Sequence, residues 1–247
     1  MLEVTYYGNA TFSIATPETT VLVDPYLTEN DECPWDAETV LDREDPDAVC
    51  VTHVAFDHVG EAAELARDHG VEILTEHATA RYLRSEGVPE ERITTVVWGM
   101  EADIGDLSVR ILESRHASIA EIDGESVSGV PLSFLFSHDG DSVYHMGDTS
   151  IFRDLRTYGE LHDPDVVLTG VGQAYDAAAR SEGTITRRIF ELSTDEAVLA
   201  TRWLNADRVV PMHYVDDERE RFLETLAEAE ETAEAVPLDP GESLRVG

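Results

Sequence analysis

The sequence predicts an α/β fold of four layers, an αββα sandwich in which two β-sheets pack face to face and helices cover both outer faces. Strand-like runs gather in both halves of the chain, and each group is followed by alternating strand and helix patterns. Hydrophobic residues make up 42% of the 247 residues, and no linker rich in glycine, proline or serine divides them. We therefore expect a single domain over residues 1–247 with one continuous core.

The first half begins with short strand-like runs and continues as strand and helix units. Strands are expected at residues 4–7, 11–15, 20–24, 47–52 and 71–75. Apolar residues at helical spacing predict helices at residues 59–69 and 79–86.

The second half repeats this organisation. Strands are expected at residues 93–97, 107–112, 132–137 and 142–146, the last two joined by a tight turn at residues 138–141. The chain then predicts a strand, a helix, a strand and a closing helix at residues 166–169, 194–204, 208–210 and 218–235. Residues 173–192 show little periodicity, which indicates a long loop or lid of the kind that is often functional.

Acidic residues greatly outnumber basic ones in the sequence. Fifty-two acidic residues face 17 basic ones, all of them arginine, for a net charge of −35. Such a field repels nucleic acids and anionic membranes, so neither is an expected partner. The acidic residues are spread along the chain, which favours adaptation of the whole surface to high salt, where the Debye length is only about 3 Å at 1 M. A merely acidic enzyme from a low-salt cell is the alternative.

Other features suggest an ordinary cytoplasmic enzyme. No apolar run reaches the roughly 20 residues of a membrane helix, and the first residues read as a strand rather than a signal peptide. Cys33 and Cys50 form no CxxC pair and no disulfide framework, and neither is a good nucleophile candidate. A small-molecule substrate is the expected partner, and a homo-oligomer stays open.

Side chains that bind metals follow four of the predicted strands. His53, Asp57 and His58 lie in one strand-to-helix loop, and the other segments are residues 114–116, 147–149 and 211–214, which carry His116, Asp148 and His213. Loops at strand ends can converge on one rim of a sheet, and imidazole with carboxylate suits zinc, manganese or iron. A metal site at this rim is therefore predicted.

A lone histidine near a strand end is more often a core or hydrogen-bonding residue than a ligand. The order of the four segments, each at a strand end, is what favours a metal site. Five other histidines are assigned structural roles, although His145 could also support a ligand because it precedes Gly147-Asp148: His69, His77, His138, His145 and His162.

Several runs carry a family resemblance: LVDPYLT at residues 22–28, the segment of residues 53–60, Trp98-Gly99, VYHMGDT at residues 143–149, and VVPMHY at residues 209–214. Together they resemble the metallo-β-lactamase-fold hydrolases, closest to the branch of uncharacterised metal-dependent hydrolases and L-ascorbate-6-phosphate lactonase-like proteins. The resemblance covers nearly the full chain and implies the same αββα fold.

The resemblance also implies roles for the ligand candidates. Its first-loop motif, His-x-His-x-Asp-His, places His53 and His116 in a first metal site and Asp57, His58 and His213 in a second, with Asp148 bridging the two. Here the sequence departs from the pattern, because Ala55 stands where the motif has its second histidine. Asn9 and Gln173 also stand where relatives commonly have histidine and aspartate.

What the resemblance implies is a metal-dependent hydrolase with a depleted first site. One tight ion is expected on Asp57, His58, Asp148 and His213, with a weak second ion at most. Zinc is the expected metal, with manganese or iron as alternatives. A metal-bound hydroxide would attack a small ester, lactone or phosphoester, with Asp57, His116 and Asp148 as the catalytic candidates.

Two other functions stay open at this point. One is a metal-binding protein whose catalysis has decayed with the missing histidine, acting as a sensor or binding module. The other is redox or oxygen chemistry at an iron site, which the fold also hosts.

Overall fold

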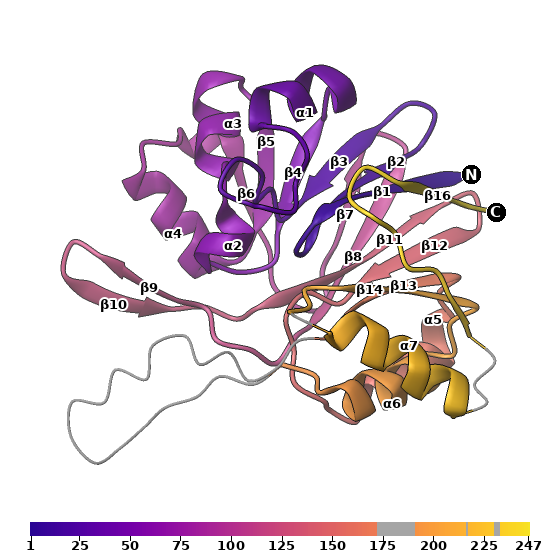
Figure 1. Ribbon diagram of the computed structural model, residues 1–247. Coiled ribbons are helices and arrows are strands. Elements are labelled where there is room, and N and C mark those ends of the chain that lie inside the picture. The colour runs from indigo at the N-terminus through magenta and orange to yellow at the C-terminus, as the bar shows by residue number, and fades with distance from the viewer. Residues whose placement is uncertain (172–190, 216, 230–232) are drawn as a thin grey trace, which may run out of the picture.

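A computed structural model describes residues 1–171, 191–215, 217–229 and 233–247 of the chain. Two seven-stranded sheets pack against each other, and helices cover the outer face of each (Figure 1). This arrangement confirms the predicted four-layer α/β fold. Most of the predicted lid at residues 173–192 lies outside the described residues.

The first sheet is antiparallel at one edge and parallel from its fourth strand onward. In spatial order its strands are β16 (Ser243–Val246), β1 (Leu2–Gly8), β2 (Thr11–Ala15), β3 (Thr20–Val23), β4 (Ala48–Val51), β5 (Glu72–Thr75) and β6 (Ile93–Thr95).

The second sheet is built in the same way, with a parallel half and an antiparallel half. Its order is β15 (Glu234–Ala235), β14 (Arg208–Met212), β13 (Val166–Gly170), β12 (Asp141–His145), β11 (Leu132–His138), β8 (Leu107–Glu113) and β7 (Glu101–Ile104). A separate hairpin, β9 (Ile119–Ile122) and β10 (Glu125–Ser128), projects from the body (Figure 1).

Helices cover the two outer faces, and the main core lies between the sheets. The first sheet is covered by α1 (Ala37–Glu44), α2 (Phe56–Val59), α3 (Ala62–Asp68) and α4 (His77–Ser85), with a short 3-10 turn at Glu90–Arg92. The second is covered by α5 (Asp154–His162), α6 (Thr194–Leu204) and α7 (Glu218–Glu228). Aliphatic and aromatic side chains from both sheets, including Tyr6, Phe12, Phe134 and Phe136, fill the space between them.

Two predicted helices differ from the structure. The helix expected at residues 59–69 is broken at Gly60, whose φ is +37° and whose Cβ position would lie 2.1 Å from the carbonyl oxygen of Pro25. The helix expected at residues 218–235 ends at Glu228, because residues 234–235 form β15 and pair with β14. Residues 230–232 are outside the described part of the chain.

The parallel halves of the two sheets place their carboxyl ends at one rim. Asp24 and Thr52 follow β3 and β4 of the first sheet directly, while β14 of the second sheet ends just before His213. Binding sites in open α/β sheets form beyond the carboxyl ends of such strands. The topology therefore brings side chains that are far apart in the sequence to one place.

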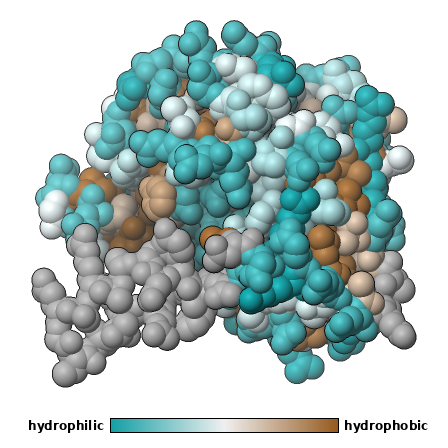
Figure 2. Space-filling model, viewed as in Figure 1, coloured by the Kyte–Doolittle hydropathy of each residue, from teal (hydrophilic) through white to brown (hydrophobic). Residues whose placement is uncertain are grey.

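Polar residues dominate the face of the molecule that Figure 2 shows. Hydrophilic residues cover most of the face in view, and hydrophobic ones show in smaller areas (Figure 2). Among the described residues, none of the helices has the length and apolar character that crossing a bilayer requires.

The net charge of −35 predicts a fold that salt stabilises. Repulsion between like charges opposes the compact state in dilute buffer, and salt screens it over a Debye length of about 3 Å at 1 M. The melting temperature should rise as potassium chloride increases from 0.05 M to about 2 M. A melting temperature that stays flat or falls over this range would contradict the high-salt interpretation.

Candidate metal centre

The loop after β4 sets the position of three candidate ligands. The backbone N–H of Thr52 donates to Asp24 Oδ1 at 2.7 Å, which fixes the end of the strand. The single helical turn α2 then begins after Ala55 and stops at Gly60, where the chain passes against Pro25. This short turn carries Asp57 and His58 back toward the strand end.

Asp24 and Thr52 orient two histidine rings. The His58 Nδ1 lies 2.7 Å from Asp24 Oδ2, and the Thr52 hydroxyl donates to the same oxygen at 2.7 Å. Because that hydroxyl proton is committed to Asp24, its oxygen accepts from His53 Nδ1, 3.0 Å away. When neutral, both rings are thereby held in the tautomer that leaves Nε2 free to bind a metal.

The loops that carry His116 and Asp148 are tied to each other. The Ser114 hydroxyl donates to the carbonyl oxygen of Asp148, and the Arg115 N–H donates to Thr149 Oγ1 at 3.0 Å. At Gly147, with φ +59°, a Cβ would lie 2.9 Å from the carbonyl oxygen of Leu132. Only glycine permits this close approach without displacing a neighbouring strand.

Asn9 joins the first and last of these loops. His213 has a φ of +51°, in the left-handed region, and its N–H donates to the carbonyl oxygen of Asn9 at 2.9 Å. The Asn9 side-chain amide donates to the carbonyl oxygen of Asp57 at 3.0 Å. Asn9 therefore positions two loops through their backbones.

The six predicted ligands converge around one carboxylate. Asp148 Oδ2 faces the Nε2 atoms of all four histidines, at 3.1 Å (His58), 3.7 Å (His116), 3.7 Å (His213) and 3.9 Å (His53). Asp57 Oδ2 lies 3.3 Å from His213 Nε2. The ligand atoms of His53, His116 and Asp148 form one compact group, and those of Asp57, His58 and His213 form another. A third group joins Asp148 and His213 to Glu191.

The residues present fit a bound cation. His53 Nε2, His58 Nε2 and Asp148 Oδ1 are buried without a hydrogen-bond partner among the described residues. Leaving a buried polar atom unsatisfied costs about 1–3 kcal/mol, and several such atoms in one place call for a shared partner. A divalent cation held by imidazole nitrogens and carboxylate oxygens satisfies all of them.

The four histidines divide into two electrostatic classes. Burial lowers the pKa of His53 to about 3 and also lowers the pKa of His116. Burial opposes the charge on His58 and His213 too, but Asp148 and the other nearby carboxylates raise the pKa of both rings well above its usual value. In the metal-free protein these two rings therefore hold an extra proton between carboxylates.

This difference predicts that metal binding releases protons from the site. A metal ion must displace about two protons, one from His58 and one from His213, so its affinity should rise with pH. In the metal-free protein, these raised pKa values stabilise the fold fully below the unfolded histidine pKa of about 6.5. That stability is lost as pH rises through the folded pKa values. The melting temperatures of metal-free and metal-loaded protein should thus diverge as pH rises above about 6.5, and a constant gap would contradict this account.

The remaining histidines lie outside the cluster of ligands. His145 is buried at its base, but Nε2 donates to the carbonyl oxygen of Ala10 at 2.9 Å and Nδ1 accepts from the Gly147 N–H at 3.2 Å. Both of its nitrogens are used, so it supports the Gly147 turn and has no free atom for a metal. His69 is exposed at the end of α3.

Two carboxylates at the site were not assigned roles from the sequence. Asp24 belongs to the quoted LVDPYLT run, but its contact with His58 spans 34 residues and depends on β3 and β4 being neighbours. Glu191 lies within the predicted lid and its Oε2 is 3.0 Å from His213 Nδ1. Burial raises the pKa of Glu191, and the nearby Asp148 raises it further.

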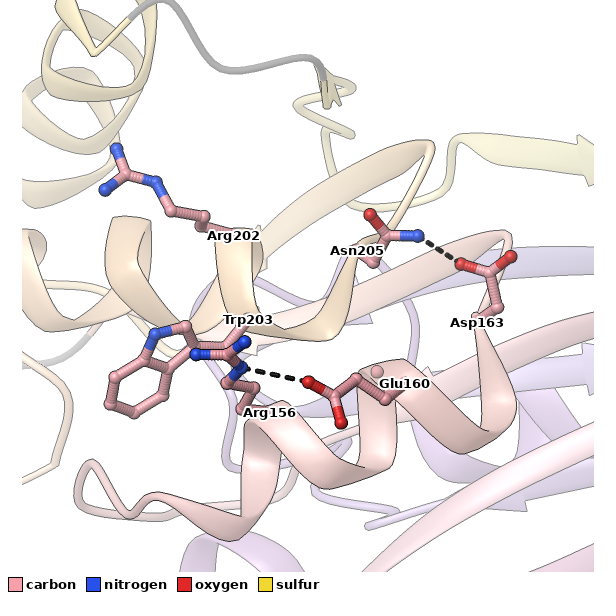
Figure 3. A pocket seen from close by; sticks show the side chains of 7 residues that line it. Arg156, Glu160, Asp163, Arg202, Trp203 and Asn205 are labelled. Atoms are coloured by element: carbon pink, nitrogen blue, oxygen red, sulfur yellow. Dashed lines mark hydrogen bonds and ion pairs between the residues drawn. The ribbon is translucent and has the colours of Figure 1, made fainter.

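A hollow of about 550 Å³ between α5 and α6 is a separate feature (Figure 3). It is lined by polar and aromatic side chains, among which Arg156 pairs with Glu160 at 3.0 Å and Asn205 with Asp163. None of its lining residues is a candidate metal ligand, and it lies in the outer helical layer. It is therefore not part of the candidate metal centre.

Fold and site together define a class of protein. The family model described as "Beta-lactamase superfamily domain" matches residues 19–214, a range that includes all six candidate ligands. The chain thus has the fold of the metallo-β-lactamase superfamily.

Proteins of similar sequence and structure identify the family within this superfamily. The chain is 32% identical over 252 residues to a UPF0173 metal-dependent hydrolase of Methanoculleus marisnigri, covering 100% of this chain and 97% of that one. A UPF0173 metal-dependent hydrolase of Methanosarcina mazei is 30% identical over 251 residues, 99% of each chain. Igni18, a metallo hydrolase from the archaeon Ignicoccus hospitalis KIN4/I, has a similar structure, with a TM-score of 0.78, 26% identity and coverage of 98% and 97%. The chain belongs to the UPF0173 metal-dependent hydrolase family of this superfamily.

Proposed function

We propose that the protein hydrolyses a small ester, lactone or phosphoester with one tightly held divalent metal ion. That ion is bound by Asp57, His58, Asp148 and His213. The observation that carries the proposal is the convergence of unpartnered, buried Nε2 atoms on Asp148, which itself has an unpartnered oxygen. Nitrogen and oxygen ligands in a set of four favour zinc, with manganese or iron as the alternatives.

The first site is depleted in this proposal. Among the described residues, its group of ligand atoms comprises those of His53, His116 and Asp148 alone. Ala55 is the N-cap residue of α2, and its methyl side chain has no atom that can bind a metal. Because Asp148 is shared with the second site, the first site has only two ligands of its own, and its ion is held weakly.

Each group then has a distinct role in hydrolysis. A divalent ion held by these residues would supply Lewis-acid chemistry, activating water near neutral pH and polarising the reacting oxygen of the substrate. Asp57 and Asp148 hold the ion and place carboxylate oxygens where the proton of the attacking water can be accepted. His116 is neutral and part-exposed at the same rim, so it can accept the proton of the attacking water and then donate that proton to the leaving group.

The charges around the site favour an uncharged substrate. Arg115, next to His116, contacts Glu113 at 2.9 Å and Asp154 at 3.6 Å, and stacks over the Phe152 ring. Its charge is therefore already compensated, and the field of the whole chain is negative. Esters and lactones should be turned over faster than phosphoesters in low salt, and the difference should shrink in molar salt.

Ala55 also favours a second candidate function, a metal-binding protein of the same fold without catalysis. The two are separated by stripping the metal, restoring zinc, manganese or iron in turn, and assaying a panel of esters, lactones and phosphodiesters in molar potassium chloride. Hydrolysis that disappears with the metal and returns with one ion per chain supports the hydrolase. Full metal uptake without turnover of any substrate supports the second candidate.

A further inference from the structure

Glu191 reaches the metal centre from outside the loops of the ligand motif. It stands three residues before α6 (Thr194–Leu204), whose start is fixed by a capping box between Ser193 and Glu196. The Glu191 side chain is buried, 8% exposed, and its carboxylate lies beside the His213 ring. Its Oε2 has no aligned hydrogen bond among the described residues, although it lies 3.0 Å from His213 Nδ1.

The two nitrogens of the His213 ring face different carboxylates. Nδ1 faces Glu191, while Nε2 lies 3.3 Å from Asp57 Oδ2 and 3.7 Å from Asp148 Oδ2. The nitrogen on the side of the proposed ion is therefore Nε2. Glu191 lies beside Nδ1, from which it can accept a hydrogen bond, and its carboxylate is also within 4.8 Å of the ligand atom of Asp148.

His58 also has a buried carboxylate beside Nδ1, and there the contact is a hydrogen bond. Its Nδ1 is 2.7 Å from the buried carboxylate of Asp24, and its Nε2 is 3.1 Å from Asp148 Oδ2. A carboxylate behind a metal-bound histidine fixes the ring and makes it a stronger ligand. His53 of the first site has only the neutral hydroxyl of Thr52 in this place.

We propose that Glu191 is a positioning residue that holds His213 through Nδ1 and so completes the second metal site. Both histidines of that site are then backed by a buried carboxylate, and neither histidine of the first site is. This asymmetry adds to the loss of a ligand at Ala55 in concentrating affinity on one ion. The inference rests on the proposed second metal site but not on hydrolysis.

The test is a cobalt titration of the full-length, metal-stripped protein in molar potassium chloride, followed by visible absorption. Glu191→Ala should weaken cobalt affinity about 10–100-fold, the usual effect of losing such a partner. Glu191→Gln keeps an oxygen that accepts from Nδ1–H but loses the charge, so its affinity should lie between that of Glu191→Ala and that of the unmodified protein. The cobalt absorption band should keep its position and intensity in both variants, because the ligands themselves are unchanged. Glu224→Ala, on the exposed side of α7, is the matched control and should bind as the unmodified protein does.

A double substitution at Glu191 and His213 distinguishes a positioning role of Glu191 from a general effect on folding. In a His213→Ala background, Glu191→Ala should weaken cobalt binding no further. If Glu191→Ala does not fold, Glu191→Asp decides, because its shorter side chain keeps the charge and cannot reach Nδ1: a loss of about tenfold supports the proposal.

Several results would overturn it. Affinity within twofold of the unmodified protein in Glu191→Ala, or in Glu191→Asp where that variant decides, would show that Glu191 does not act on the site. A weaker, shifted cobalt band in both Glu191→Ala and Glu191→Gln would make Glu191 a ligand instead. An unmodified protein that binds no cobalt would overturn both this inference and the proposed function, whereas cobalt binding without hydrolysis would overturn the proposed hydrolase alone.

Discussion

Replacing His58 with alanine should release the tightly held metal ion and unfold the protein at a lower temperature. His58 contacts Asp148 with one nitrogen and Asp24 with the other, and its ring is fully buried. An ion present at about 1,000 times its dissociation constant stabilises the folded state by about 4 kcal/mol, which the variant loses. Asp24 also loses its charged partner inside the protein, a change that typically costs about 3–5 kcal/mol.

The measurement is metal content by elemental analysis together with thermal unfolding, each with and without a chelator. His69→Ala is the matched control, because His69 is exposed at the end of α3 and contacts none of the ligands. The control should keep both its ion and its melting temperature. Full metal retention in His58→Ala would exclude His58 from the site.

Replacing Ala55 with histidine should create the missing ligand and fill the first site. Ala55 has φ −70° and ψ 149°, an ordinary extended conformation that histidine adopts without strain. Metal content should rise from about one ion per chain toward two, because the first site would regain its three imidazoles and the shared Asp148. Ala55→Gln is the control, since it adds comparable bulk without an imidazole and should leave metal content unchanged.

The turnover of Ala55→His then distinguishes two forms of the hydrolase. If hydrolysis works best with a metal pair, turnover should rise together with the second ion. If the site is adapted to one ion, metal content should rise while turnover stays constant or falls, because the second ion occupies space for the substrate. A metal content that does not change on this substitution would contradict the depleted first site.

Much of the fold could be predicted because its strands are short, apolar and bounded by turns. The strand at residues 166–169 and the helix at residues 194–204 match β13 and α6 closely, and the turn at residues 138–141 has Asp139 and Gly140 at positive φ, as a tight hairpin requires. The helix that was extended to residue 235 is rich in alanine and glutamate, which favour helices. Pairing with β14 determined the conformation of its end instead.

Elements with weak patterns were missed. The helix α1 lies in a polar segment, where its start depends on Asp36 accepting from the Thr39 N–H. The hairpin of β9 and β10 is mostly exposed, so burial leaves no alternating pattern in its sequence. Strand β16 exists because β1 offers it an edge, which residues 243–246 alone do not reveal.

The candidate ligands follow strand ends, and that placement made their convergence predictable from order alone. The carboxylates behind them were harder to predict. The partners Asp24 and Glu191 are 34 and 22 residues from the histidines that they contact, and neither separation is a motif. Asn9 was noted as a departure from relatives, but its role in joining the backbones at Asp57 and His213 depends on three loops meeting.

The metal content of the unmodified protein tests the central claim most directly. The protein should be purified in molar potassium chloride without added metal, dialysed against a weak chelator, and analysed for zinc, manganese and iron per chain. The account predicts about one tightly bound ion per chain, with a second taken up only at much higher free metal concentration. Two ions that survive dialysis equally well, or none that binds at all, would contradict it.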